Sequence, residues 1–323
     1  MGSTKNSSGG GTAATTTTSN ISLDIQLDKA SKVYAQNDTI RGKVLLFTKT
    51  DLKHDGVFLQ LDGNVRMCTL SQSAGVIDSL TASNVKPINV CSWANQLSYP
   101  DRVLTGKTEL PFEIPLSLPP SKTLHESYHG LYLAVEYFIR AELKRSFPNK
   151  PITKHCEICI EYSKSGGKSD AAIESPLAFT ITPDSVKGAL KSGQAKQPRF
   201  KVTGRLTTCS ARLNEPFTGE LTVHECDLAI VSVDLVLMRV ETCGSRSAGA
   251  LLHEKSEVLQ SQMIAGDVPR NLTVPIFLIL PRFFCCATVE TPTHAVDYEL
   301  RIVFDFGQFG RVHEAFPITL HRW

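Results

Sequence analysis

The chain has 323 residues, of which 41% are hydrophobic and 20% charged, which is typical of a soluble folded protein large enough for two hydrophobic cores. Its net charge is +2 and no long block of one sign occurs, so the sequence lacks the basic footprint of a nucleic-acid-binding protein. The first residues lack the apolar core of a signal peptide, and the longest apolar run, residues 272–280, is too short to cross a bilayer. We therefore expect a cytoplasmic protein with no nucleic-acid partner.

Residues 1–20 are rich in Ser, Thr and Gly and too polar to bury a core, so we expect a disordered N-terminal extension. Beyond them, short alternating runs separated by turn-forming residues are typical of strands. The predicted strands are residues 21–27, 40–47, 57–65, several weak ones within 68–100, 131–143, 152–162, 177–182, 200–206, 221–225, 230–240, 257–264, 274–280, 296–304 and 315–320. The helical candidate, residues 184–190, is short and contains Gly188. The sequence thus predicts an all-β protein.

The longest of these strands follows a stretch rich in proline. Residues 131–143 carry apolar side chains at every second position, which predicts a long strand with one buried face. The preceding apolar run contains Pro111, Pro115, Pro119 and Pro120, and proline cannot donate to a strand ladder. We therefore expect that run to be an edge strand or a strand broken by a bulge.

Four of the predicted elements occur twice, in the same order, in the two halves of the chain. The matched pairs are Gly42 with Gly219, residues 57–61 with 233–237, 112–116 with 272–276, and 135–137 with 296–298. The alternative explanation is that any two β-sandwiches share turns and proline-ended strands. The conserved order of the matches favours two tandem β-sandwich domains, residues 21–175 and 176–323, with a polar linker at residues 163–174.

Nine cysteines occur without the spacing of a disulfide framework, which indicates reduced thiols. Cys156 and Cys159 have the spacing of a metal or redox pair, but residues three apart on a strand point to opposite faces. The segment 106–108 ends like a phosphate-binding loop, yet Asp101 stands where that loop needs glycine. Because no catalytic motif occurs either, we expect a protein that is not an enzyme and holds no metal or cofactor.

Two such sandwiches, each with a glycine-containing strand, a proline-broken strand and a long tyrosine-containing strand, resemble the arrestin fold. Five longer segments are similar to the vacuolar protein sorting-associated protein 26 family, and within it to the arrestin-like subunit of the retriever complex, a paralogue of the retromer small subunit. These segments are residues 128–133, 144–146, 179–183, 239–244 and 264–268. The resemblance covers about residues 21–323 and gives the N-terminal extension no family role.

The resemblance implies a non-enzymatic scaffold on the cytosolic face of endosomes that takes part in recycling membrane cargo. Its implied partners are a helical-solenoid subunit, a small phosphoesterase-like third subunit and a sorting-nexin cargo adaptor, with membranes reached through the complex. In the retromer paralogue the solenoid docks on the C-terminal sandwich through a loop that contains an apolar pair. The matching residues here are Met263, Ile264, Ala265, Gly266 and Asp267.

Three alternatives remain open. The first is that Met263 and Ile264 end a strand and face the protein's own core. The second is an arrestin-type adaptor that links receptor tails to ubiquitin ligases; such proteins carry Pro-Pro-x-Tyr motifs, whereas the Pro-Pro pair at residues 119–120 is followed by Ser and Lys. The third is an enzyme or metal protein that uses the thiols.

Overall fold

The computed structural model describes residues 20–69, 83–84, 86–103, 105–117, 124–161, 176–188, 199–244, 252–281 and 285–322. Within these ranges the chain forms β-strands and turns, and helical structure is limited to the 3₁₀ turn Gly307–Phe309. The prediction of an all-β protein is thus confirmed. The expected linker, and the expected disordered extension apart from Asn20, lie outside the described residues.

The chain groups into two compact units, which we describe separately. The first unit comprises Met1–Asn64, Asn89–His125 and Glu136–Glu161, and the second comprises Val65–Ile88, Glu126–Val135 and Tyr162–Trp323. The second unit therefore includes two segments, Val65–Ile88 and Glu126–Val135, from the N-terminal half of the sequence. The boundary expected between residues 175 and 176 stays a prediction.

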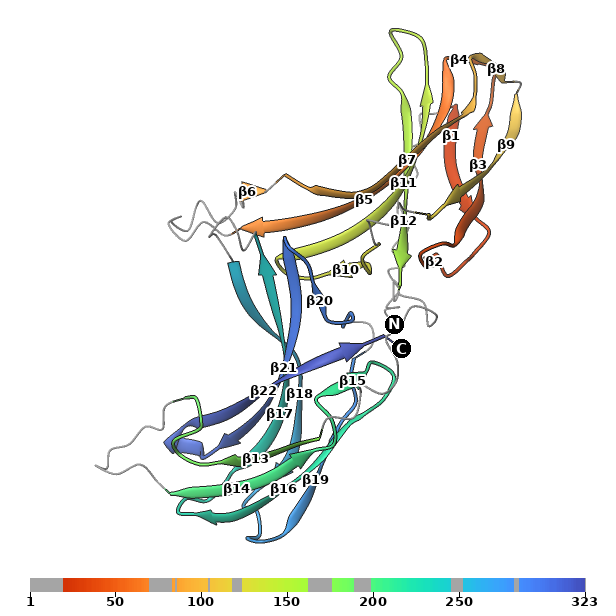
Figure 1. Ribbon diagram of the computed structural model, residues 1–323. Coiled ribbons are helices and arrows are strands. Elements are labelled where there is room, and N and C mark those ends of the chain that lie inside the picture. Colours follow the sequence, from red (N-terminus) through yellow and green to blue (C-terminus); the bar gives the residue numbers. More distant parts are fainter. Residues whose placement is uncertain are drawn as a thin grey trace, which may run out of the picture. The chain divides into compact units, whose positions relative to one another are not determined.

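The N-terminal half of the chain forms two main sheets and a short ribbon (Figure 1). The smaller sheet has the order β1 (Ile21–Leu27), β3 (Thr39–Thr48) and β9 (Gly106–Pro115). The larger sheet has the order β2 (Val33–Tyr34), β12 (Ile152–Ile160), β11 (Leu133–Lys144), β5 (Gly56–Thr69) and β6 (Ser83–Asn84), with β10 (Tyr128–His129) on β11 and β7 (Ile88–Ser98) on β5. The ribbon pairs β4 (Leu52–His54) with β8 (Asp101–Val103). The proline-containing strand β9 lies at an edge, as expected.

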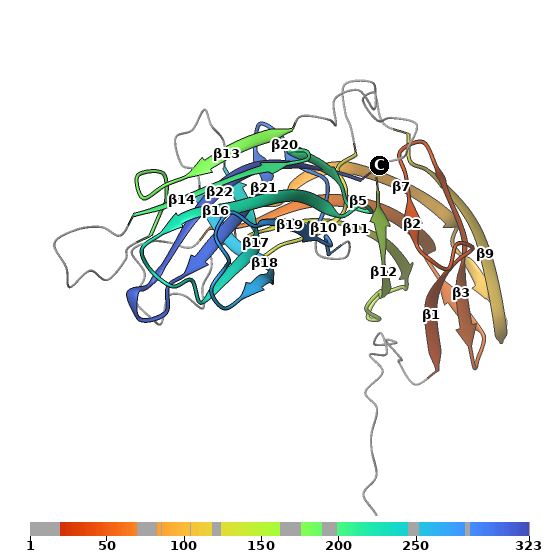
Figure 2. The same ribbon diagram turned by 90° about the horizontal axis from the view of Figure 1, so that it is seen from below.

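The C-terminal half repeats this arrangement (Figures 1 and 2). Its smaller sheet has the order β13 (Leu177–Ile181), β14 (Phe200–Leu206), β16 (Phe217–Cys226) and β19 (Thr273–Leu278). Its larger sheet has the order β15 (Ser210–Arg212), β22 (Arg311–His321), β21 (His294–Asp305), β17 (Ser232–Cys243) and β18 (Leu252–Ala265), with β20 (Val289–Glu290) on β21. The strand β18 is therefore the outer strand of its sheet.

The two halves match in detail, which confirms the predicted repeat. In each larger sheet a short strand runs parallel to its neighbour, β2 beside β12 and β15 beside β22. Each long central strand also carries a buried tyrosine. The hydroxyl of Tyr137 donates to the carbonyl oxygen of His125 at 2.8 Å, and the hydroxyl of Tyr298 accepts from the N–H of Cys286 at 3.1 Å. Both partners precede their tyrosine by 12 residues.

One detail of the predicted repeat is wrong. In the N-terminal half Lys43, which follows Gly42, pairs with Pro111. In the C-terminal half Glu220, which follows Gly219, pairs with Pro275. Pro275 therefore corresponds to Pro111, and not to Pro115 as the sequence match required. Because Pro115 lies four positions after Pro111 and side chains alternate with a period of two, both prolines lie on the same side of β9, and alternation alone cannot choose between them.

The strand expected at residues 131–143 is β11, and its alternation has the predicted consequence. Leu133, Val135, Tyr137 and Ile139 are buried, and the series continues to the end of the strand. Leu131, which the pattern included, precedes the strand and is 65% exposed. The segment 184–190 is not a helix in its described part, because Lys187 instead forms two backbone hydrogen bonds with His313, at 2.8 and 2.9 Å.

Candidate partner-binding site

The predicted partner-binding residues lie where the outer strand β18 ends. Ala265 pairs with Ser232 and Ile264 with Val233, but the next pair joins Gln262 to Asp234. Met263 is therefore the extra residue of a β-bulge. A bulge on an edge strand bends the chain and re-aims the side chain of the extra residue.

The bulge separates the two apolar side chains that the sequence placed together. Ile264 lies directly opposite Val233, which is completely buried, and residues opposite each other point to the same side of a sheet. Ile264 thus leans toward the protein's own core, although it stays half-exposed at the sheet edge. Met263 is also half-exposed, and the bulge frees it from that constraint. Of the two, Met263 is the better candidate for an external contact.

A tight turn follows the strand. Gly266 adopts a left-handed φ of +85°, and its N–H donates to the carbonyl oxygen of Val231 at 2.8 Å. A Cβ atom added to Gly266 would meet nothing within 4 Å. Glycine is therefore favoured here by its backbone conformation and not by crowding.

Asp267 organises this turn from within. Its Oδ1 accepts hydrogen bonds from the backbone N–H of Ile230 and from the Arg270 guanidinium, both at 3.1 Å. The N–H of Ile230, with Arg270 beside it, holds the pKa of the Asp267 carboxyl below its usual value. Ile230, which donates to Asp267, and Val268, which follows Asp267 in the chain, are both buried, so both anchor the turn to the core. The carboxylate is thus engaged by its own loop.

Two further apolar residues, which the sequence did not single out, belong to the same end of the sheet. Val231 is 52% exposed, and its N–H donates to the carbonyl oxygen of Asp305 at 2.8 Å. It also lies beside the 3₁₀ turn, because a Cβ added to Gly307 would sit 3.2 Å from a Val231 methyl group. Phe309, at the end of that turn, is 39% exposed. Residue 231 fell inside the predicted strand 230–240 and residue 309 after the predicted strand 296–304, so the sequence contained no signal that both are exposed at this end of the sheet.

A buried carboxylate joins two of the segments on which the family resemblance rested. Glu241 on β17 is 1% exposed. Its Oε1 accepts from the Tyr128 hydroxyl and from the N–H of Leu131 (3.2 Å), and its Oε2 accepts from the N–H of Tyr132 (2.7 Å). Arg239 forms an ion pair with it at 3.1 Å. Burial, followed by the hydrogen bond to Glu241, raises the pKa of Tyr128 far above its usual value.

A second buried carboxylate secures the same segment. Glu126 is 2% exposed, and its two oxygens accept from Nε and Nη2 of Arg322 at 3.0 and 3.1 Å. The N–H of Ala287 also donates to it, at 3.2 Å. Residues 126–132 are therefore held within the second unit by two buried carboxylates, Glu126 and Glu241. Buried carboxylates of this kind are strongly destabilising if their partners are removed.

Two surface pockets, called hollows below, are lined by polar and charged side chains. In one of about 510 Å³, the Ser210 hydroxyl and His321 Nε2 lie 2.7 Å apart, beside Cys209. Burial lowers the pKa of His321 and raises the pKa of the Cys209 thiol. At neutral pH the imidazole is thus uncharged and the thiol protonated. The serine–histidine bond links the parallel strands β15 and β22, and we assign it a structural role.

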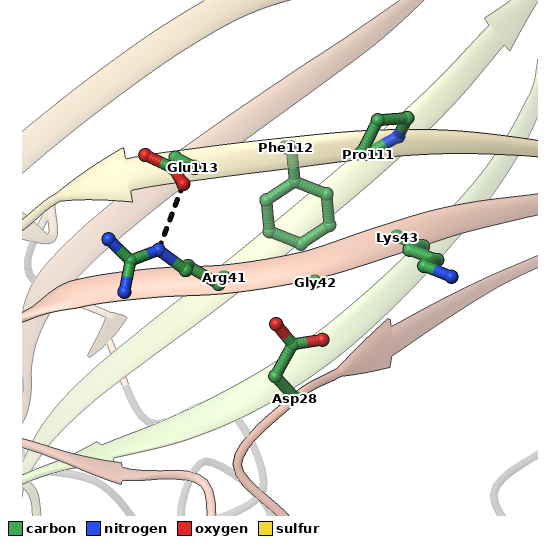
Figure 3. A pocket seen from close by; sticks show the side chains of 7 residues that line it. All are labelled: Asp28, Arg41, Gly42, Lys43, Pro111, Phe112 and Glu113. Carbon is green, nitrogen blue, oxygen red and sulfur yellow. Dashed lines mark hydrogen bonds and ion pairs between the residues drawn. The ribbon is translucent and has the colours of Figure 1, made fainter.

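The hollow in Figure 3, of about 370 Å³, lies on the smaller N-terminal sheet. Gly42 lines it, and no larger residue would fit there, because an added Cβ would come within 2.9 Å of the Phe112 ring and 2.4 Å of a backbone oxygen. Its cations are paired with carboxylates, Arg41 with Glu113 at 2.9 Å and Lys43 with Glu109 at 2.8 Å. Exposed ion pairs of this type contribute little stability, and here they engage both Arg41 and Lys43.

Metal binding has no support in the described part of the chain, where no three His, Cys, Asp or Glu side chains are grouped so as to hold an ion. Neither Cys156 nor Cys159 on β12 forms a disulfide there. No helix among the described residues has the length and apolar character needed to cross a membrane.

Residues 12–305 match the family model described as Vps26, vacuolar protein sorting-associated protein 26. The chain is 32% identical, over 303 residues, to the vacuolar protein sorting-associated protein 26C of Dictyostelium discoideum, an alignment that covers 93% of this chain and 99% of the relative. The all-β architecture fits the arrestin-like fold that the sequence predicted. The chain belongs to the vacuolar protein sorting-associated protein 26 family.

Proposed function

We propose that this chain is a non-enzymatic scaffold subunit of a retriever-type complex that recycles membrane cargo from endosomes. Membership of a retromer-like family of vacuolar sorting proteins supports the general role. The Dictyostelium relative is a 26C protein, which supports the retriever-type branch. In this proposal the chain works by binding partners and holds no cofactor.

The principal partner is a helical-solenoid subunit that docks on residues 263–267. The observation that carries this assignment is the bulged end of β18, where Met263 is half-exposed beside a turn fixed by Asp267. A few apolar anchors supply most of the binding energy of an interface. A turn that is already ordered loses little conformational freedom on binding, so it binds more tightly than a flexible one.

The remaining partners reach the chain through this solenoid. They are a small phosphoesterase-like third subunit and a sorting-nexin cargo adaptor, and the assembled complex lies on the cytosolic face of endosomes. Glu126 and Glu241 contribute by keeping residues 126–132 ordered within the second unit. The hollows with paired charges have no part in this assignment.

The test is affinity purification of the tagged chain with identification of its partners, followed by single substitutions. Met263→Asp places a carboxylate in a contact that must exclude water, at a cost of several kcal/mol. Since about 1.4 kcal/mol weakens binding tenfold, the solenoid should be lost from the purification. Val231→Asp probes the neighbouring turn in the same way. Ile279→Asp is the matched control, because Ile279 is 69% exposed in the same unit but belongs to a different sheet edge.

Thermal unfolding of each variant separates binding from folding. Met263→Asp should melt as the wild type does, whereas Ile264→Asp should melt lower because Ile264 faces the core side of the sheet. A stable Met263→Asp variant that retains the solenoid would place the interface elsewhere. Recovery of ubiquitin ligases without a solenoid would support the arrestin-type adaptor instead.

A further inference from the structure

One end of the first unit is built from three turns that are joined to each other. The Ser146 hydroxyl, in the β11–β12 turn, donates to Asp55 Oδ1 at 2.8 Å, and the Asp55 N–H donates to the carbonyl oxygen of Lys144 at 2.9 Å. The neighbouring Gly56 brings in the β7–β8 turn, because its added Cβ would lie 3.2 Å from the carbonyl oxygen of Ser98. Figure 1 shows β4, β8 and the β11–β12 turn at the same end of the N-terminal half. We call this end the tip.

The tip presents two aromatic side chains to solvent. Phe147 is 97% exposed and Tyr99 is 75% exposed. The turn that carries Phe147 is well defined: Arg145 Nε donates to the carbonyl oxygen of Lys150 at 2.9 Å, and the N–H of Asn149 donates to that of Ser146 at 3.1 Å. Its hydrogen bonds thus hold Phe147 away from the protein's own core. Exposed apolar groups of this size mark interaction sites when other features support them.

The supporting feature is charge. Between Glu142 and Glu157 the sequence contains four cationic residues and no carboxylate, although the whole chain has a net charge of only +2. Two of the four are engaged locally, Lys144 over the Phe58 ring at 4.1 Å and Lys154 with Asp24 at 3.2 Å. Arg145 and Lys150 flank Phe147 in the turn itself. The aromatic residue is therefore flanked by positive charge within its turn, and Asp55, the nearby carboxylate, accepts a hydrogen bond from the Ser146 hydroxyl.

We propose that the tip contacts an anionic membrane directly and inserts Phe147 into the interface between headgroups and acyl chains. A projecting aromatic residue flanked by Lys and Arg suits a bilayer surface, where the ring enters the apolar layer and the cations stay among anionic headgroups. A protein partner would need a pocket of matching shape and negative charge. This contact goes beyond the proposed function, in which partners bring the chain to membranes.

The experiment measures binding of the purified full chain to vesicles by flotation. One set of vesicles is phosphatidylcholine alone, and in the other about a third of the lipid is phosphatidylserine. The wild type should float with the anionic vesicles, and less so as salt is added. Phe147→Ser should weaken binding about tenfold, which corresponds to about 1.4 kcal/mol. Lys150→Gln should weaken it about fivefold, the effect of one cation at such a surface.

Two controls make the result specific. Phe277→Ser removes a phenylalanine that is 56% exposed on β19, in the second unit, and should leave vesicle binding unchanged. Phe147→Trp keeps an interfacial aromatic, so it should still bind. Its added fluorescence, relative to the wild type, should be quenched by lipids brominated along their acyl chains. Because Phe147 makes so little contact with the protein, all tip variants should keep the wild-type Tm.

Three outcomes would overturn the proposal: a wild type that ignores anionic vesicles, a Phe147→Ser variant that binds them as the wild type does, or a Phe147→Trp variant whose added fluorescence brominated lipid leaves unquenched. Loss of a protein partner from Phe147→Ser with unchanged vesicle binding would also overturn it and assign the tip to that protein. Retention of the solenoid by Phe147→Ser keeps this test separate from that of the proposed function.

Discussion

The clearest energetic prediction concerns Glu241→Gln, which keeps the shape of the side chain and removes its charge. In the native structure Oε1 faces the Tyr128 hydroxyl, the Leu131 N–H and Arg239, while Oε2 accepts from the Tyr132 N–H at 2.7 Å. The amide oxygen of glutamine can occupy only one of these places. Its NH₂ group then faces another donor, and Arg239 is left without its counter-charge.

The magnitude follows from burial. Glu241 is 1% exposed, and the Arg239 side chain is 11% exposed, so solvent screens their interaction little. Removing one partner of such a buried pair typically costs about 3–5 kcal/mol. For a folding unit of this size, that corresponds to a fall of about 10 °C in Tm. Removal of an exposed ion pair elsewhere in the chain, such as Arg41 with Glu113, should change stability far less, because solvent screens it.

The assay is urea and thermal unfolding of the full chain, with Glu225→Gln as the control. Glu225 is an exposed carboxylate of β16 in the same unit, so its substitution should change stability by less than about 0.5 kcal/mol. Gly130→Ala provides a second perturbation of the same contact, because the added Cβ would stand 2.0 Å from Glu241 Oε1. The double variant should lose less stability than the two single losses combined. Additive losses, or a Glu241→Gln variant as stable as Glu225→Gln, would refute the assigned role.

Two further predictions concern titration. Burial lowers the pKa of His125, His313 and His321, so each binds a proton less readily in the folded chain than in the unfolded chain, whose pKa is near 6.5. Their contribution to stability is present above that pH and is lost as pH falls through the folded values, so Tm should decrease between about pH 6.5 and 5; an unchanged Tm would contradict this. Burial also raises the pKa of Cys285 to about 11 and of Cys286 to about 12. A thiol reagent at pH 8 should therefore modify both only after denaturation, as peptide mapping can show.

The fold was largely predictable because it depends on local patterns. The period-two alternation in β11 and the recurring Gly-containing strands are properties of neighbouring residues, and they led to the two tandem sandwiches. The Pro115 error shows the limit of that signal. Prolines on the same side of one strand satisfy the pattern equally, and only the pairing with β3 identifies Pro111 as the counterpart of Pro275.

The candidate site was less predictable because its geometry depends on distant residues. Met263 and Ile264 are adjacent in sequence, but their pairing with β17 places a bulge at Met263. The role of Asp267 depends on the N–H of Ile230, which lies 37 residues away. Glu241 is farther still from its donors, with Tyr128 113 residues away. A single sequence gives no signal for such contacts, although the resemblance drew attention to both segments that Glu241 joins.

The bulge at Met263 also has a consequence for self-association. A regular outer strand of the length of β18, 14 residues, would offer a continuous row of unpaired backbone groups to the edge of another chain. The pairing of β17 with β18 is irregular at two places, between Val233 and Asp234 and between Leu237 and Met238. The first part of β18 also carries three charged residues, Glu254, Lys255 and Glu257. Irregular pairing and charge both oppose the addition of a further strand. The bulge that leaves Met263 half-exposed thus also opposes polymerisation of the protein through the edge of this sheet.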